Sequence, residues 1–132
     1  MRAHRIAAAA LLALVAAGCR LDPEDDRYAR AFIAHFHARD STAAALLEPG
    51  SEISEAGWIA VSALAELLPE GRLDSLRLTA WEYIHNEDGR SRKLTYLVFG
   101  GDEQAQAEIW IVTHDGTRYV NTVRTMDLDS AR

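Results

Sequence analysis

The second half of the chain reads as β-strands. Ser75–His85 and Ala105–Thr113 alternate hydrophobic with polar residues, the pattern of half-buried strands. Lys93–Phe99 is rich in residues that favour strands, and Tyr119–Met126 is the fourth predicted strand. In the first segment we expect Leu76, Leu78, Ala80 and Ile84 on one face, and Arg77, Thr79, Trp81, Tyr83 and His85 on the other.

Short turn signals separate these four segments. They are Asp88-Gly89, Gly100-Gly101-Asp102 and Asp115-Gly116, and each is typical of a β-hairpin. Four strands joined by tight turns form an antiparallel meander.

The first half has helical periodicity instead. Tyr28, Phe32 and Phe36 recur every four residues, which predicts an amphipathic helix running to about Arg39. The acidic run that begins with Asp22-Pro23 supplies an N-cap, a proline at the first helical position and carboxylates near the positive end of the helix dipole.

Two further helices are expected before the sheet. Asp40 or Ser41 caps a helix over Thr42–Glu48, which Pro49-Gly50 ends. Another helix opens at Ser54 and stops at Pro69, with a very short strand expected within Pro49–Ile53. Helices packed on a meander sheet give a two-layer α+β domain.

This order of elements resembles the nuclear-transport-factor-2-like and cystatin-like superfamily over roughly residues 23–126. The resemblance rests on the helix Tyr28–Arg39, the junction Arg39-Asp40-Ser41 followed by Leu46-Leu47, and the four-strand ending. It implies a curved sheet that wraps the first helix in a cone, with a pocket used for small apolar ligands or for dimer contacts. A plain α+β sandwich of another topology remains the alternative.

The N-terminus has the layout of an export signal. Met1–Arg5 is basic, Ile6–Ala17 is a run of twelve apolar residues, and small residues precede Cys19. This run is shorter than the about 20 residues that a membrane-spanning helix needs. Ala16-Ala17-Gly18-Cys19 resembles the lipobox of bacterial lipoproteins, although leucine is the usual first residue.

The lipobox resemblance implies cleavage between Gly18 and Cys19 and acylation of Cys19, with palmitate as a typical chain. We therefore expect a signal peptide over residues 1–18, a lipidated tether over 19–22 and one α+β domain over 23–132. The implied location is the bacterial cell envelope. Arg20 after the cysteine, rather than aspartate, favours the outer membrane and a periplasm-facing domain in a Gram-negative host. Ordinary secretion with a free Cys19 is the alternative.

The net charge and the cysteine content limit the kinds of partner and cross-link that this chain can have. The 14 basic and 20 acidic residues give a net charge of −6. Because Arg2 and Arg5 are the only charged residues before Cys19, the processed chain carries 12 basic and 20 acidic residues, or −8. This balance argues against nucleic-acid binding. Cys19 is the single cysteine, so no internal disulfide can form.

Few residues suggest chemistry. The candidate pocket-lining residues are Trp81, Tyr83, His85 and Trp110. Packing of these side chains in the core is the simpler interpretation. His85 would act as an acid or base only beside a carboxylate, for which Glu108 or Asp115 are the candidates.

Metal and cofactor sites are not expected. His35 and His37 are two residues apart on a helix and therefore point in different directions, with His35 at the border of the core and His37 in solvent. We find no metal-binding, cofactor or catalytic motif in the sequence.

Two functions are consistent with these patterns. The first is a non-enzymatic lipoprotein whose domain binds a partner protein or a small apolar ligand, or forms a homodimer through its sheet face. The alternative is a small pocket enzyme, an isomerase, dehydratase or hydrolase of the ketosteroid-isomerase-like type, working with residues such as Tyr83, His85, Glu108 and Asp115.

Overall fold

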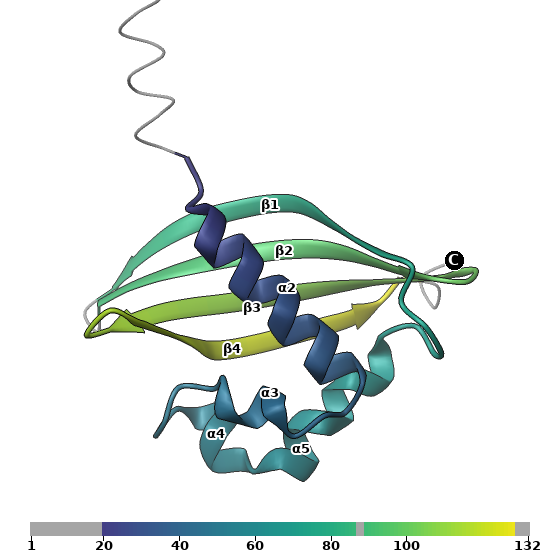
Figure 1. Cartoon of the computed structure of the whole chain (residues 1–132), viewed down its shortest axis with the longest axis horizontal. Helices are drawn as coiled ribbons and strands as arrows, with labels where there is room; N and C mark the ends of the chain where they lie inside the picture. Colours follow the sequence, from purple (N-terminus) through teal and green to yellow (C-terminus); the bar gives the residue numbers. More distant parts are fainter. Residues whose placement is uncertain (1–19, 87–88, 129–132) are drawn as a thin grey trace, which may run out of the picture.

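The computed structural model describes residues 20–86 and 89–128, in which helices precede a four-stranded sheet (Figure 1). The helices are α2 (Pro23–His37), α3 (Thr42–Ala45), α4 (Glu52–Ala56), α5 (Trp58–Ala63) and the 3₁₀ helix η1 (Leu64–Leu67). The strands are β1 (Ser75–Asn86), β2 (Gly89–Gly100), β3 (Glu103–His114) and β4 (Thr117–Asp127).

The sheet is an antiparallel meander in the order β1-β2-β3-β4. Helix α2 crosses one face of the sheet, and the shorter helices lie beside β4 (Figure 1). The predicted α+β architecture, with N-terminal helices packed against a four-stranded meander, is confirmed.

The start of α2 follows the predicted capping. The Asp22 side chain accepts a hydrogen bond from the Glu24 backbone N–H at 2.9 Å, and Pro23 occupies the first turn. The helix ends at His37 rather than at Arg39, because Arg39 adopts a left-handed conformation with a φ of 54°.

The later helices differ from the prediction. Helix α3 stops at Ala45 because the chain then pairs with β4: the Val120 N–H donates to the Leu46 carbonyl and the Glu48 N–H donates to the Val120 carbonyl, both at 2.8 Å. The short strand expected within Pro49–Ile53 is therefore wrong, since the strand-like contact lies earlier in the chain.

The predicted third helix is split. Gly57 has a φ of 89°, which no right-handed helix accommodates, and it separates α4 from α5. Ser51 rather than Ser54 caps α4, accepting a hydrogen bond from the Ser54 N–H.

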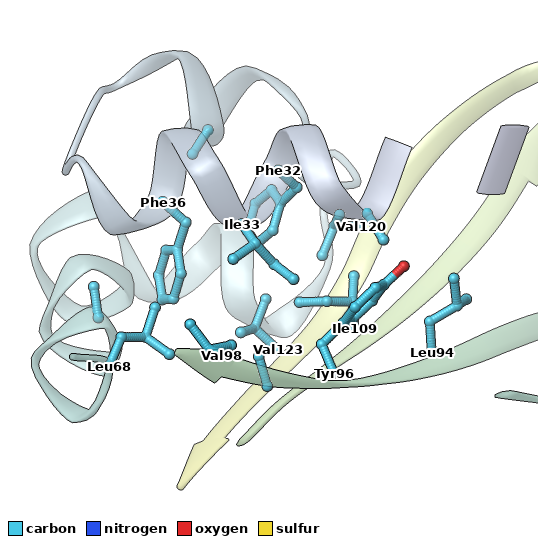
Figure 2. Packing of buried hydrophobic residues seen from close by; sticks show 14 of the residues in the cluster. Phe32, Ile33, Phe36, Leu68, Leu94, Tyr96, Val98, Ile109, Val120 and Val123 are labelled. Carbon is cyan, nitrogen blue, oxygen red and sulfur yellow. The ribbon is translucent and has the colours of Figure 1, made fainter. Parts of the chain in front are cut away.

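The core fills the space between α2 and the sheet (Figure 2). Phe32, Ile33 and Phe36 project from α2, and the rings of Phe32 and Phe36 stack with centroids 5.4 Å apart. They meet a buried layer from the sheet: Leu94, Tyr96, Val98, Ala105, Ala107, Ile109, Ile111, Val120 and Val123. The alternation predicted for the third strand is confirmed, because Ala105, Ala107, Ile109 and Ile111 are all buried.

The alternation predicted for the first strand is correct only to Leu78. A β-bulge at Thr79 shifts the register between Leu78 and Ala80, so that Leu78 lies opposite Tyr96 and Trp81 opposite Leu94. Trp81, Tyr83 and His85 therefore share the helix-covered face with Leu76 and Leu78, while Arg77 points to the other face.

Candidate functional site

The four predicted pocket residues do not form one site. Trp81 lies opposite the buried Leu94, whereas Trp110 lies opposite Lys93, the next residue along β2. Because successive residues of a strand point to opposite faces, Trp110 is on the face away from α2, and Trp81, Tyr83 and His85 are on the face toward it.

Trp81 and Tyr83 form an aromatic pair at the β1 side of the sheet. Their rings meet edge to face with centroids 5.5 Å apart. Trp81 packs against the core, while Tyr83 is 45% exposed. The Tyr83 hydroxyl donates to the Arg20 carbonyl at 3.3 Å, which ties the start of the described chain to β1.

The candidate pairing of His85 with Glu108 is not formed. The Glu108 carboxylate lies on the face away from α2, where it pairs with the Lys93 ammonium at 3.0 Å. Asp115 occupies the β3–β4 turn with a φ of 51°, as predicted for a turn residue.

A buried ion cluster at the start of α2 was not predicted from the sequence. Asp25 is only 2% exposed. Arg92 of β2 donates to both of its carboxylate oxygens, at 2.9 and 2.7 Å, and Arg118 of β4 donates to one of them at 2.8 Å. Arg118 also reaches Asp22 at 2.7 Å, so the cluster links the helix start to two strands.

The cluster holds Asp25 in its ionised form. Burial by itself raises the pKa of Asp25, but the hydrogen bonds and positive charges of Arg92 and Arg118 together place that pKa below its ordinary value of 3.8. Two guanidinium groups therefore keep a buried carboxylate charged, which is the behaviour of a structural ion cluster rather than of a general base that must take up a proton.

Tyr96 belongs to a neighbouring polar group. Its hydroxyl is fully buried and donates to an Asp26 carboxylate oxygen at 2.7 Å, and the Arg30 guanidinium lies 5.4 Å from its ring centroid. Burial, and then the Asp26 hydrogen bond, raise the pKa of Tyr96 far above its ordinary value. Tyr96 consequently remains protonated and fixes α2 to the sheet.

The side of the sheet turned away from α2 is here called the open face. Members that the four strands contribute to it include Arg77, Glu82, Lys93, Leu97, Phe99, Glu108, Trp110, Arg124 and Met126. Lys93 bridges Glu82 and Glu108 at 3.1 and 3.0 Å, and its ammonium also lies 5.4 Å from the Trp110 ring centroid. Arg124 approaches the same ring at 5.9 Å. Trp110 is thus a half-buried aromatic ring between two cations.

The histidines of α2 are held separately. The His35 Nδ1 lies 3.1 Å from an Asp40 carboxylate oxygen, and the His37 Nε2 lies 2.8 Å from the Pro69 carbonyl oxygen. His37 was predicted to point into solvent, but it instead joins the end of α2 to the chain after η1. Among the described residues, no group of three or more His, Cys, Asp or Glu side chains could hold a metal ion.

One cleft lies near His37 rather than near Trp81. Its volume is about 950 Å³, and its walls include His37, Arg39, Glu66, Pro69 and Arg72. None of the four predicted pocket residues lines it. The cleft is polar, and the His37 Nε2 is engaged with the carbonyl of Pro69, which also lines the cleft.

Comparisons with protein-family models, with characterised proteins and with solved structures found no match. The predicted cleavage site at Gly18 and the predicted lipid attachment at Cys19 lie outside the described residues. Within residues 20–86 and 89–128, no helix is long and apolar enough to cross a membrane.

Proposed function

We propose that this chain is an exported bacterial lipoprotein that acts by binding through the open face of its sheet. The signal-like N-terminus and the lipobox-like Ala16–Cys19 support export and acylation at Cys19. More than one acyl chain on that residue would give stable anchoring in the cell envelope. The resemblance to the nuclear-transport-factor-2-like and cystatin-like superfamily belongs to the same proposal.

The open face carries the binding proposal. Trp110 is flanked by Lys93 and Arg124, and the exposed Met126 lies on the same face. Aromatic residues, methionine and arginine are enriched at the centres of protein interfaces. By contrast, apolar side chains fill the space between α2 and the sheet. The face of the sheet toward α2 is therefore occupied by core packing.

Charge distribution favours a second copy of this chain as the occupant. The helical part, residues 20–74, contains 11 acidic and 5 basic residues, so two copies would repel each other through it. The open face instead carries both signs, with Arg77, Lys93 and Arg124 beside Glu82 and Glu108. Anchoring in one membrane would raise the effective concentration of such partners.

Replacing Cys19 with serine tests the anchor. We expect Cys19→Ser to abolish labelling by a palmitate analogue and to move the protein from the membrane fraction to the soluble fraction, because serine offers no thiol for acylation. Metabolic labelling and cell fractionation measure both effects. A Cys19→Ser protein that still takes up the label would contradict lipidation at this residue.

Replacing Trp110 with alanine tests the open face. The processed chain carrying Cys19→Ser should form a dimer, and Trp110→Ala should raise its dissociation constant by about 30-fold or more, the loss expected for a central interface residue. Sedimentation equilibrium measures this constant. Ile59→Ala, at an exposed position on α5, is the matched control and should leave the constant unchanged. Equal dissociation constants for all three proteins, or a monomer throughout, would remove the open face as a self-association surface.

A further inference from the structure

The described part of the chain begins very close to β1. Only Arg20, Leu21 and Asp22 separate Cys19 from the first residue of α2, and three residues span at most about 11 Å. The Tyr83 hydroxyl holds the Arg20 carbonyl at 3.3 Å, so the tether is also fixed at its base. A lipid anchor at Cys19 would therefore leave the domain little freedom to turn away from the bilayer.

The direction of this attachment is set by the fold. The described chain enters next to β1, the first strand of the sheet, whereas α4, α5 and η1 lie on the side of β4 (Figure 1). The β1 side thus faces the attachment point, and the short helices are the part of the domain farthest from it.

The side chains around the tether have the composition of a membrane interface. Tyr83 is about half exposed and contacts Trp81, and tryptophan and tyrosine are enriched where proteins meet lipid headgroups. The exposed Arg20 and Arg90 add positive charge. Acidic residues of the tether, of the start of α2 and of β1 are paired with cations: Asp22 with Arg118, Glu24 with Arg27 and Glu82 with Lys93.

From this geometry we infer that the β1 side of the domain, with Tyr83 and Trp81, rests in the headgroup layer of the membrane that holds the anchor. The inference rests on the proposed acylation of Cys19. It assigns an orientation: the border of β1 opposite β2 lies against lipid, and the short helices project away from the bilayer. The partner of this surface is a phospholipid bilayer. Arg20 and Arg90 should strengthen the contact when the headgroups are anionic.

Single-tryptophan variants of the full lipidated protein can test the orientation. Trp58→Phe with Trp110→Phe leaves Trp81 on the β1 side, and Trp81→Phe with Trp110→Phe leaves Trp58 on α5 as the matched control. Both proteins are reconstituted in vesicles of anionic phospholipid that contain a phospholipid with a nitroxide on its headgroup. We expect the nitroxide to quench Trp81 fluorescence at least about twofold more than Trp58 fluorescence, because only Trp81 lies within reach of the short tether.

Substitutions at Tyr83 add a second test. In the variant that retains Trp81, Tyr83→Asp should reduce quenching to the level of Trp58, because a carboxylate is expelled from the headgroup region of an anionic bilayer. Tyr83→Phe should preserve quenching. Far-ultraviolet circular dichroism verifies that each variant is folded.

Mass spectrometry of the reconstituted samples separates the two proposals. If Cys19 carries no acyl chain, the proposed lipoprotein function is wrong and the orientation is wrong with it. If Cys19 is acylated but Trp58 and Trp81 are quenched equally, or Trp58 more strongly, the orientation alone is overturned.

Discussion

Replacing Asp25 with alanine is expected to lower the free energy of unfolding by about 3–5 kcal/mol, the usual cost of removing one partner from a buried ion pair. The Asp25 side chain is almost inaccessible, and it accepts hydrogen bonds from Arg92 and Arg118. Its removal leaves two guanidinium groups facing each other without a shared anion. Denaturation by urea, followed by circular dichroism, measures the change.

Glu24→Ala is the matched control for Asp25→Ala. Glu24 is the adjacent residue of α2 and also pairs with an arginine, Arg27, but both side chains are exposed. Surface pairs contribute little, so we expect a loss of no more than about 1 kcal/mol. Equal losses for the two variants would show that the buried cluster does not stabilise the domain more than a surface pair does.

The effect of Asp25 should also depend on pH. Its folded-state pKa lies below the ordinary value of 3.8, so it contributes stability that is present above that value and is lost as the pH falls through the folded-state pKa. The difference in unfolding free energy between the natural protein and Asp25→Ala should therefore be full at neutral pH and shrink below about pH 4. Urea denaturation at several pH values measures this trend, and a difference that grows on acidification would contradict it.

Phe32→Ala should also destabilise the domain by about 3–5 kcal/mol, because a large ring is removed from a core that cannot fully collapse around the cavity. Phe32 is fully buried, stacks on Phe36 and faces the sheet (Figure 2). Phe32→Leu keeps most of the volume and should cost less than about 1.5 kcal/mol.

Ile59→Ala provides the comparison for Phe32. Ile59 is 87% exposed on α5, and substitutions at such positions change stability by no more than about 0.5 kcal/mol. Thermal or urea denaturation of the three variants should rank them Phe32→Ala, Phe32→Leu and Ile59→Ala in decreasing loss. A loss at Phe32 as small as that at Ile59 would mean that α2 does not pack on the sheet as described.

Local patterns were sufficient to predict the architecture. The period-four stripe of α2, its Asp22-Pro23 start and the turns at Gly101-Asp102 and Asp115-Gly116 each depend on neighbours in the sequence, and all are present in the structure. The predicted turn residue Asp88 lies outside the described residues. Helix breaks were harder to place. Gly57 interrupts the predicted third helix because it adopts a positive φ, yet a single glycine within a helical pattern does not by itself end a helix.

The candidate sites depended on information that the sequence does not display. One extra residue at the Thr79 bulge reverses which side chains of β1 face the helix, so Trp81 and Tyr83 were assigned to the wrong set of neighbours. The Asp25 cluster joins residues 67 and 93 positions apart, and Asp25 itself looked like one more carboxylate of an acidic helix start. The two arginines become its partners only when the ends of β2 and β4 are brought together.

The two borders of the sheet are finished differently. Along β4, the backbone of residues 46–48 pairs with Val120, and α4 and η1 pack nearby, whereas β1 has a strand on one side only among the described residues. Strand addition from another chain at the Val120 end of β4 would therefore have to displace residues 46–48. The pairing of residues 46–48 with Val120 thus protects part of this border against edge-to-edge aggregation.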